Sequence, residues 1–336
     1  MFPSLGAYFV ATLITSFLGG YLVSPLLRRI NAVDIPNDRS SHSRPVLRGG
    51  GVAIVGAITL AAVALQVEER SFVLDAILTG ALCIAAVSFT DDLRSLSAGL
   101  RFGCQSIVAI AVLWSIFRGA SATPLAAFYY CCGFLAITGY TNAFNFMDGI
   151  NGIAAGQAFV TASGTCLCYH LAGGAWDDFS SAFSVIIAGA AAGFVPHNFP
   201  RARLFMGDVG SATLGMLLSS TCVWMVTRIG PSLVPWLLAL HMNFILDTGF
   251  TLARRVMRGE KWYSAHREHF YQRMVRANFS HACVTGWEMG LQVLVLAMCV
   301  SGIVHGVPGI LVLVAVLIVW ILFFSFAEYQ FKRAAA

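Results

Sequence analysis

The segment from residue 142 to residue 152 reads Asn142-Ala-Phe-Asn145-Phe-Met-Asp148-Gly149-Ile-Asn151-Gly152. It joins two long apolar segments, so its amide and carboxylate side chains are expected at a membrane face. In a helical turn Asn145 and Asp148 would share a face. Glycine lets a ligand approach the backbone closely. The segment therefore suits a nucleotide or metal-phosphate site, and an ordinary polar turn is the alternative.

The composition of the whole chain indicates an integral membrane protein. Of 336 residues, 58% are hydrophobic and 11% are charged, whereas an average soluble domain has about 25% charged residues. Apolar runs long enough to cross a hydrocarbon core of about 30 Å recur throughout. They predict an all-α, polytopic membrane protein that forms one domain, residues 1–336, with ten to eleven transmembrane helices. The expected spans lie near residues 5–27, 49–66, 72–90, 102–117, 124–141, 153–172, 179–196, 209–227, 233–253, 285–305 and 308–327.

Basic residues are distributed unevenly between these spans. Eighteen of the 21 lysines and arginines fall on one side, in the segments 28–48, 94–101, 201–203, 254–276 and 332–333. The positive-inside rule places that side in the cytoplasm. The same asymmetry accounts for the net charge of +5, so no nucleic-acid partner is expected. Each inner loop also carries acids, histidines or asparagines beside glycines, which predicts an active site on the cytoplasmic face.

Two adjacent acids, Asp91 and Asp92, end the third predicted span. Carboxylates in such a place are costly unless they are used. Successive helical residues point about 100° apart, so one acid is expected to face the substrate and the other to orient a neighbouring base or helix end. Helix capping is the alternative for one of the pair. Arg94 and Arg101, in the loop that follows, are candidate substrate-binding residues.

Two further inner loops combine glycine with arginine. Arg48 stands directly before Gly49–Gly51, where a helix is expected to begin, and such an arrangement suits an anion. The alternative is that this arginine only fixes the topology. Between residues 197 and 211, Asp208 is flanked by glycines and follows two arginines. It is interpreted as a metal ligand, with capping of the next helix as the alternative.

The longest inner loop contains His266-Arg267-Glu268-His269. In a helix the two histidines would share a face. No third soft ligand lies at a spacing useful for zinc, so phosphate contacts or support of a hard-metal site are expected, against a solvated amphipathic loop. Asp247 lies inside the ninth span, where an acid is a functional candidate. An internal ion pair that holds helices together is the alternative for Asp247.

Together these motifs resemble the polyprenyl-phosphate N-acetylhexosamine-1-phosphate transferase family, glycosyltransferase family 4. The resemblance covers nearly the whole chain and rests on Asp91-Asp92, on residues 142–152, on Phe205 to Ser211 and on His266 to Arg273. Members transfer a sugar 1-phosphate from a UDP-sugar to a polyprenyl phosphate and release UMP. The resemblance implies Mg²⁺, or Mn²⁺ in its place, a UDP-sugar donor, undecaprenyl phosphate as acceptor, surrounding membrane lipid, and a homodimer as an option.

The resemblance also implies residue roles. Asp208 matches the family's metal ligand, Asp91 the acid often proposed to deprotonate the lipid phosphate, and Asp92 its essential neighbour. Asn145 and Asp148 match positions that line the uridine site, and Phe205 matches an aromatic near the uracil. The expected catalytic residues are Asp91, Asp92, Asp208, His266 and His269. The expected substrate-binding residues are Asn142, Asn145, Asp148, Gly149, Asn151, Asn198, Phe205, Arg48, Arg94, Arg101 and Arg273.

Two positions depart from the family pattern. Asn151 stands where many members have Asp, and Glu268 interrupts a His-x-His-His pattern, both where sugar or nucleotide could be sensed. The chain resembles the branch that starts bacterial O-antigen glycans of lipopolysaccharide, with UDP-N-acetylfucosamine, UDP-N-acetylquinovosamine or UDP-N-acetylglucosamine as donors. That branch implies the bacterial inner membrane. A secondary transporter that uses Asp247 is the rival function, although transporters keep their sites near the bilayer midplane.

Overall fold

In the part of the chain that the structure describes, eleven long helices and one short one make up most of the fold. The computed structural model describes residues 4–36, 44–67, 70–121, 123–260 and 266–335. The long helices are α1 (Leu5–Arg29), α2 (Gly51–Leu65), α3 (Phe72–Leu93), α4 (Ala98–Ile116), α5 (Pro124–Phe146), α6 (Ile153–Leu171), α7 (Phe179–Asn198), α8 (Asp208–Ile229), α9 (Val234–Met257), α11 (His281–Val304) and α12 (Gly309–Ala335). The short helix is α10 (Phe270–Arg276), and a 3-10 turn (Pro231–Leu233) precedes α9. Each predicted span therefore coincides with one long helix.

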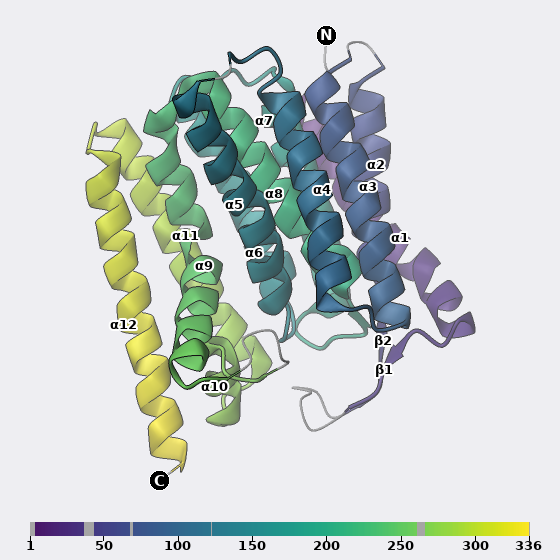
Figure 1. Cartoon of the computed structure of the whole chain (residues 1–336). Coiled ribbons are helices and arrows are strands. Elements are labelled where there is room, and N and C mark those ends of the chain that lie inside the picture. The colour runs from purple at the N-terminus through teal and green to yellow at the C-terminus, as the bar shows by residue number, and fades with distance from the viewer. Residues whose placement is uncertain (1–3, 37–43, 68–69, 122, 261–265, 336) are drawn as a thin grey trace.

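The long helices lie side by side as a bundle of membrane-spanning length (Figure 1). Within the described residues, eight helices are long and apolar enough to cross a membrane: α1, α3, α4, α7, α8, α9 with its 3-10 turn, α11 and α12. Helix α2 is apolar but shorter, at 15 residues. These observations confirm an all-α, multi-pass membrane protein.

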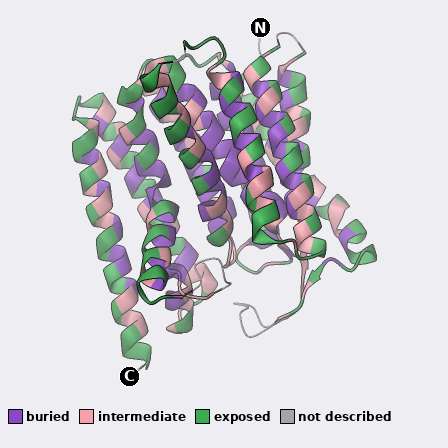
Figure 2. Cartoon of the chain, viewed as in Figure 1, coloured by how far each residue is buried: buried purple, intermediate pink, exposed green. Residues whose placement is uncertain are grey.

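Burial identifies the centre of the bundle. Most of α7 and α8 is buried, whereas α11 and α12 turn many apolar side chains outward (Figure 2). Small residues let the inner helices approach closely. A Cβ on Gly51 would lie 2.3 Å from the Cα of Gly210, so α2 and α8 begin in backbone contact. The glycines predicted to open α2 thus bring two loops together.

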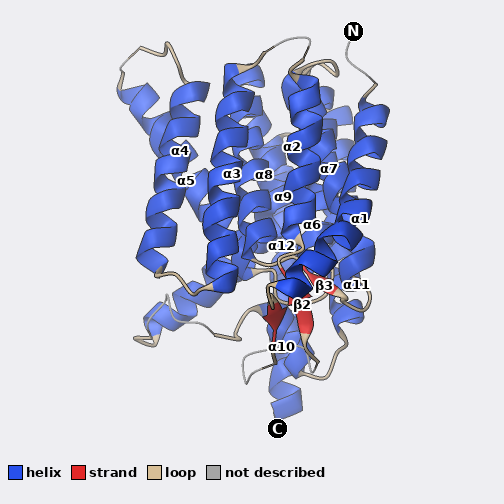
Figure 3. Cartoon of the chain, turned by 90° about the vertical axis from the view of Figure 1, so that its right-hand side faces the viewer, coloured by secondary structure: helices blue, strands red, loops and turns tan. Residues whose placement is uncertain are grey.

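A small sheet lies beyond the helix ends, on the same side as α10 and the C-terminus (Figures 1 and 3). Strand β2 (Val46–Arg48) lies between β1 (Val33–Asp34), which is antiparallel to it, and β3 (Leu204–Phe205), which is parallel. The register pairs Arg48 with Phe205. The N–H groups of Gly50 and Gly51 continue the pairing by donating to the carbonyls of Phe205 and Met206. The sheet therefore places Arg48 beside the start of α8.

Candidate active site

Asp92 caps the N-terminus of α8. Its Oδ1 accepts the backbone N–H of Asp208 at 3.0 Å, and its Oδ2 accepts that of Val209 at 3.1 Å. Gly207, with φ of 72°, allows this approach, because a Cβ there would lie 2.6 Å from Asp92 Oδ2. One acid of the Asp91-Asp92 pair was expected to orient a helix end, and Asp92 does so.

Asp208 is the first residue of α8, but its own side chain does not cap the helix. Its Oδ1 accepts a hydrogen bond from Arg48 Nη2 at 2.6 Å, and its Oδ2 lies 3.3 Å from Asn145 Nδ2 and 3.5 Å from Arg101 Nη1. Arg48 also binds Asp92, with its Nε 2.7 Å from Oδ1. The guanidinium of Arg48 therefore links Asp92, which caps α8, to Asp208, the first residue of that helix. Burial opposes the charge on Arg48, but the carboxylates of Asp208 and Asp92 outweigh it and raise the pKa of Arg48.

Asp91 faces a different partner, as expected for successive helical residues. Its Oδ2 lies 2.7 Å from Arg101 Nη1, and its Oδ1 accepts the N–H of Leu96 at 2.6 Å. Arg101 thereby bridges Asp91 and Asp208. Arg94, the C-cap of α3, is exposed at the edge of the same loop.

The segment 142–152 supplies the other side of the site. Asn145, in the last turn of α5, accepts the Ser211 hydroxyl at 2.6 Å on its Oδ1, which directs its Nδ2 toward Asp208. Asn142 Nδ2 donates to Gln105 Oε1 at 2.6 Å. Because α5 ends at Phe146, Asp148 lies beyond the helix, and the expected helical face shared with Asn145 does not form.

Asp148 carries a clear sign of crowded negative charge. Burial, with the carboxylates of Asp208 and Asp92, raises the pKa of Asp148 to about 7 against the opposing effect of Arg48. Three acids therefore share one electrostatic neighbourhood. A group that binds there with positive charge would favour ionisation of Asp148.

Asp247 anchors the histidine loop from within the membrane-spanning part. It is fully buried, and its carboxylate lies 2.8 Å from His269 Nδ1 and accepts the N–H groups of Phe270 and Tyr271. His269 is the N-cap of α10. Of the two interpretations of Asp247, the structure therefore shows an internal contact, which holds α9 and the start of α10 together.

The two histidines do not share a helical face, because α10 begins only at Phe270. Their ring centroids are nevertheless 4.9 Å apart. Burial, His269 and Arg255 lower the pKa of His266 to about 4, so this ring is neutral at pH 7. Arg273 donates through Nε to the carbonyl of Glu268 at 3.0 Å. It thus holds the residue that precedes His269.

Several other predicted site residues are engaged with the backbone. Asn198 accepts the N–H of Gly152 at 2.6 Å and donates to the carbonyl of Leu204 at 3.1 Å. Asn151 Nδ2 donates to the carbonyl of Pro200 at 3.0 Å. Phe205 lies in β3 and is half-buried. These contacts join the loops that carry Asp148 and Asp208.

The donor set fits a hard divalent cation at Asp208. Mg²⁺ and Mn²⁺ prefer carboxylate, carbonyl and water oxygens. Both oxygens of Asp92 are occupied by backbone N–H groups, whereas those of Asp208 face arginine and amide side chains that can exchange partners. Within the described ranges no three His, Cys, Asp or Glu residues form a ready metal cluster. A cation there would complete its shell with water or substrate oxygens.

Sequence reasoning missed two residues that shape the site. Gln105, buried on α4, holds Asn142, and a polar side chain inside an apolar span was the available signal. Tyr271 donates its hydroxyl to the carbonyl of Phe146 at 3.1 Å. A Cβ on Gly149 would lie 2.1 Å from that hydroxyl, so the glycine is required for α10 to dock on the end of α5.

Comparison with known proteins gives one family. The family model described as glycosyl transferase family 4 matches residues 74–226, from α3 to α8. A decaprenyl-phosphate N-acetylglucosaminephosphotransferase of Mycobacterium tuberculosis is 32% identical over 309 residues, covering 81% of this chain and 75% of the relative. A probable undecaprenyl-phosphate N-acetylglucosaminyl 1-phosphate transferase of Bacillus subtilis is 30% identical, covering 81% and 78%. A phospho-N-acetylmuramoyl-pentapeptide-transferase of Heliobacterium modesticaldum is 31% identical over 62% of this chain and 71% of the relative.

Proposed function

The chain belongs to the polyprenyl-phosphate N-acetylhexosamine-1-phosphate transferases of glycosyl transferase family 4, and we propose that it transfers an N-acetylated sugar 1-phosphate from a UDP-sugar to undecaprenyl phosphate, with release of UMP. It is a sugar-phosphate transferase and a multi-pass membrane protein. The names of the Mycobacterium and Bacillus relatives support N-acetylglucosamine as the sugar and a polyprenyl phosphate as the acceptor. UDP-N-acetylglucosamine is therefore the first donor to test.

The observation that carries this proposal is the capped acid at the start of α8. Asp92 fixes the backbone of Asp208, while Arg48 and Arg101 contact the Asp208 carboxylate from the side (2.6 and 3.5 Å). One helix start thus presents a carboxylate between two guanidinium groups. That combination suits a substrate with phosphate groups, which arginine recognises through paired hydrogen bonds.

Electrostatics explains why such a site is needed. The lipid phosphate and the donor diphosphate are both anions. Each pair of unit charges 4 Å apart repels by about 4 kcal/mol at an effective dielectric near 20. Several such pairs add up to on the order of 10 kcal/mol. Arg48 and Arg101 supply fixed positive charge at the helix start, and a divalent cation on Asp208 would polarise the diphosphate when bound.

We propose a direct displacement. An oxygen of the lipid phosphate attacks the sugar-bearing phosphorus, the bond from that phosphorus to the bridging oxygen breaks, and UMP leaves with that oxygen. A phosphate monoester has a second pKa near 6 and needs little help to ionise. Arg101 and Leu96 already hold both oxygens of Asp91. We therefore assign Asp91 to the positioning of Arg101 rather than to proton removal, which departs from the expectation drawn from the family.

The histidine loop is proposed to close the site over the diphosphate. His266 is neutral at pH 7 and offers one N–H donor. The Asp247 carboxylate lies 2.8 Å from His269 Nδ1 and fixes the ring, and we assign the other ring nitrogen, Nε2, to the substrate. Asp247 is thus used inside the protein, and nothing in its contacts favours the transporter that an intramembrane acid had suggested.

Orientation and cellular role complete the proposal. The sheet, α10 and the carboxyl-terminal basic residues lie at one end of the bundle (Figure 1). We propose that the protein lies in a bacterial inner membrane and that this end faces the cytoplasm. UDP-sugars are made in the cytoplasm. The O-antigen role, the homodimer and the donors UDP-N-acetylfucosamine and UDP-N-acetylquinovosamine stay predictions.

One assay tests the proposed function. Purified protein is incubated with Mg²⁺, undecaprenyl phosphate and each of the three UDP-sugars, and UMP is measured. We expect UMP release that requires both lipid and donor, greatest with UDP-N-acetylglucosamine. Failure with all three sugars, with a control relative active in parallel, would reject this donor class.

A further inference from the structure

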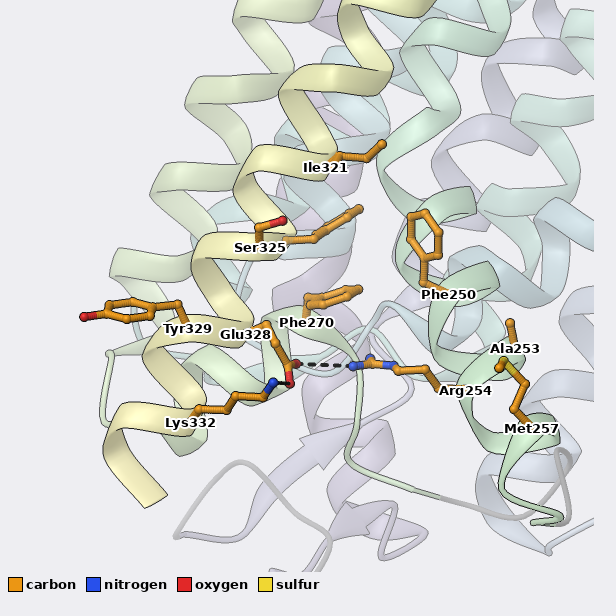
Figure 4. A pocket seen from close by; sticks show the side chains of 11 residues that line it. Phe250, Ala253, Arg254, Met257, Phe270, Ile321, Ser325, Glu328, Tyr329 and Lys332 are labelled. Atoms are coloured by element: carbon orange, nitrogen blue, oxygen red, sulfur yellow. Dashed lines mark hydrogen bonds and ion pairs between the residues drawn. The ribbon is translucent and has the colours of Figure 1, made fainter. Parts of the chain in front are cut away.

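A groove between α9, α10 and α12 lies apart from Asp91, Asp92 and Asp208. It encloses about 760 Å³, within the usual range of ligand sites. Figure 4 shows its lining: Phe250, Ala253, Arg254 and Met257 from α9, Phe270 from α10, and Ile321, Phe324, Ser325, Glu328, Tyr329 and Lys332 from α12. In Figure 1, α12 lies on the opposite side of the bundle from α3 and α4, which carry Asp92 and Arg101.

The groove is apolar toward the membrane and charged at one end. Phe270 and Phe324 stack with centroids 4.5 Å apart and form its floor, and Phe250 packs edge-on against Phe324. Arg254 and Lys332 lie at the end nearest the C-terminus of α12 (Figure 4). The apolar part of the groove therefore suits the acyl chain of a lipid, and its charged end suits the polar headgroup.

The charged end has an excess of positive charge. Glu328 is shared by three cations: Arg273 at 2.5 Å, Arg254 at 3.3 Å and Lys332 at 3.6 Å. Lys332 is 75% exposed and holds Glu328 only loosely. Glu268 also lies 3.4 Å from Arg273 and pairs with Arg258, so two carboxylates face four cations here, and the end of the groove at the exposed Lys332 complements an anion.

The length of the groove matches one leaflet. From Ile321 to Lys332 the helix advances about 16 Å at 1.5 Å per residue. This is roughly half of a hydrocarbon core of about 30 Å. An acyl chain of the cytoplasmic leaflet would extend over that distance, with its phosphate level with Lys332 and Arg254.

From this match of length, lining and charge we infer that the groove binds an anionic glycerophospholipid, with an acyl chain against Phe270 and Phe324 and the headgroup phosphate on Lys332 and Arg254. Arg254 also lies over the Phe270 ring, 4.6 Å from its centroid, and donates to the carbonyl of Glu268 at 3.2 Å. The bound lipid thus contacts the element that carries His269.

Two variants test the two parts of the groove, each with a matched control on α12. Lys332→Gln removes the exposed cation, and Arg333→Gln removes the neighbouring charge, which does not line the groove. Ser325→Phe fills the apolar part at an exposed position, and Leu322→Phe places the same new side chain at an exposed position outside it. Circular dichroism and gel filtration establish that all four variants are folded.

Binding is measured by native mass spectrometry of the purified full chain with dioleoylphosphatidylglycerol, dioleoylphosphatidylcholine or undecaprenyl phosphate. We expect the phosphatidylglycerol to bind at least fivefold more tightly than the phosphatidylcholine. Lys332→Gln should lose about fivefold, since one basic side chain contributes about 1 kcal/mol to contact with anionic lipid. Ser325→Phe should lose at least as much, and both controls should bind as the wild type does.

Three results would overturn the inference. Equal losses in Lys332→Gln and Arg333→Gln would show diffuse surface charge instead of a site. Unchanged binding to Ser325→Phe would place the acyl chain elsewhere. Displacement of phosphatidylglycerol by an equal concentration of undecaprenyl phosphate would assign the groove to the acceptor. Because the readout is binding, it is independent of whether the transferase reaction occurs.

Discussion

At the scale of single residues, Asp92 and Asp208 have different tasks although both are acids at one site. Asp92 accepts two backbone N–H groups and is almost fully buried, whereas Asp208 presents its carboxylate to side chains. A carboxylate at a helix N-terminus is also favoured by the helix dipole. The N-terminus of α8 therefore attracts both carboxylates, Asp92 in a structural role and Asp208 in a functional one.

Asparagine substitution should separate these two tasks. Asp208→Asn should lower turnover by about 100-fold or more, because a group that holds charge at the reacting phosphates is lost. It should also weaken the dependence on Mg²⁺ and leave the fold intact. Asp92→Asn should instead lower the free energy of unfolding by about 1–3 kcal/mol, because a helix cap and the partner of Arg48 are lost. Equal loss of stability in the two variants would contradict the assignment.

Asp148 predicts a pH dependence of stability. Its pKa is raised from 3.8 to about 7 in the folded protein. The folded state therefore binds a proton more tightly than the unfolded state, and stability falls as pH rises from about 4 to 7. Asp148→Asn should remove this loss. At pH 8 the variant should be more stable by on the order of 1–4 kcal/mol.

The measurement is unfolding of both proteins at pH 4 and pH 8. The gain should shrink to less than about 1 kcal/mol at pH 4, where the carboxyl is protonated in the folded state and about half protonated in the unfolded state. Asp75→Asn, at the exposed start of α3, is the matched control for loss of one carboxyl. A variant less stable than the wild type at pH 8 would show instead that the Asp148 carboxylate is paired and stabilising.

At the scale of elements, α10 decides how the histidine loop meets the acids. Asp247 holds its N-terminus and Tyr271 docks it on the end of α5. The helix has only seven residues, which is too short to give an amphipathic signal in the sequence. Its position depends on a buried acid in α9 and a glycine in another loop, so local sequence could not predict it.

The contact of Gly149 with Tyr271 gives a test of this docking. Gly149→Ala places a Cβ where the tyrosine hydroxyl lies and should lower the free energy of unfolding by about 1–3 kcal/mol through overpacking. In a Tyr271→Phe background the hydroxyl is absent, so the same substitution should cost less. Chemical denaturation of the four proteins of the double-mutant cycle measures the difference. Additive effects would mean that the two residues do not meet.

At the scale of the molecule, the positions of the eleven long helices in the described residues were predictable because each follows a local apolar run. The membership of the site was predictable in part, because Asp91, Asp92, Asp148 and Asp208 all lie at the same end of the bundle. The pairings were not, since Arg48 and Asp208 are 160 residues apart. The strand register that joins their loops involves only seven residues in all. Such short strands give no periodic signal.

The orientation of the bundle is testable by labelling. Gly99→Cys lies in the first turn of α4 on the side of the acids, at a glycine with open space around it, and Ala120→Cys lies beyond the other end of α4. In intact cells a membrane-impermeant maleimide should label Ala120→Cys alone, in a background without the native cysteines. Gly99→Cys should react only after permeabilisation. The reverse pattern would place the acids outside the cell and exclude a cytoplasmic UDP-sugar as donor.

The central claim is that sugar phosphate passes directly to the lipid and that the transfer requires Asp208 at the start of α8. The most direct test of this claim is an isotope exchange. Labelled UMP is incubated with UDP-N-acetylglucosamine, Mg²⁺ and lipid-stripped protein, and label is sought in the UDP-sugar before and after undecaprenyl phosphate is added. One diphosphate bond breaks as another forms, so the reaction should be reversible. We predict exchange in the wild type only when lipid is present, and none in Asp208→Asn. Exchange without lipid, or full exchange in Asp208→Asn, would contradict the account.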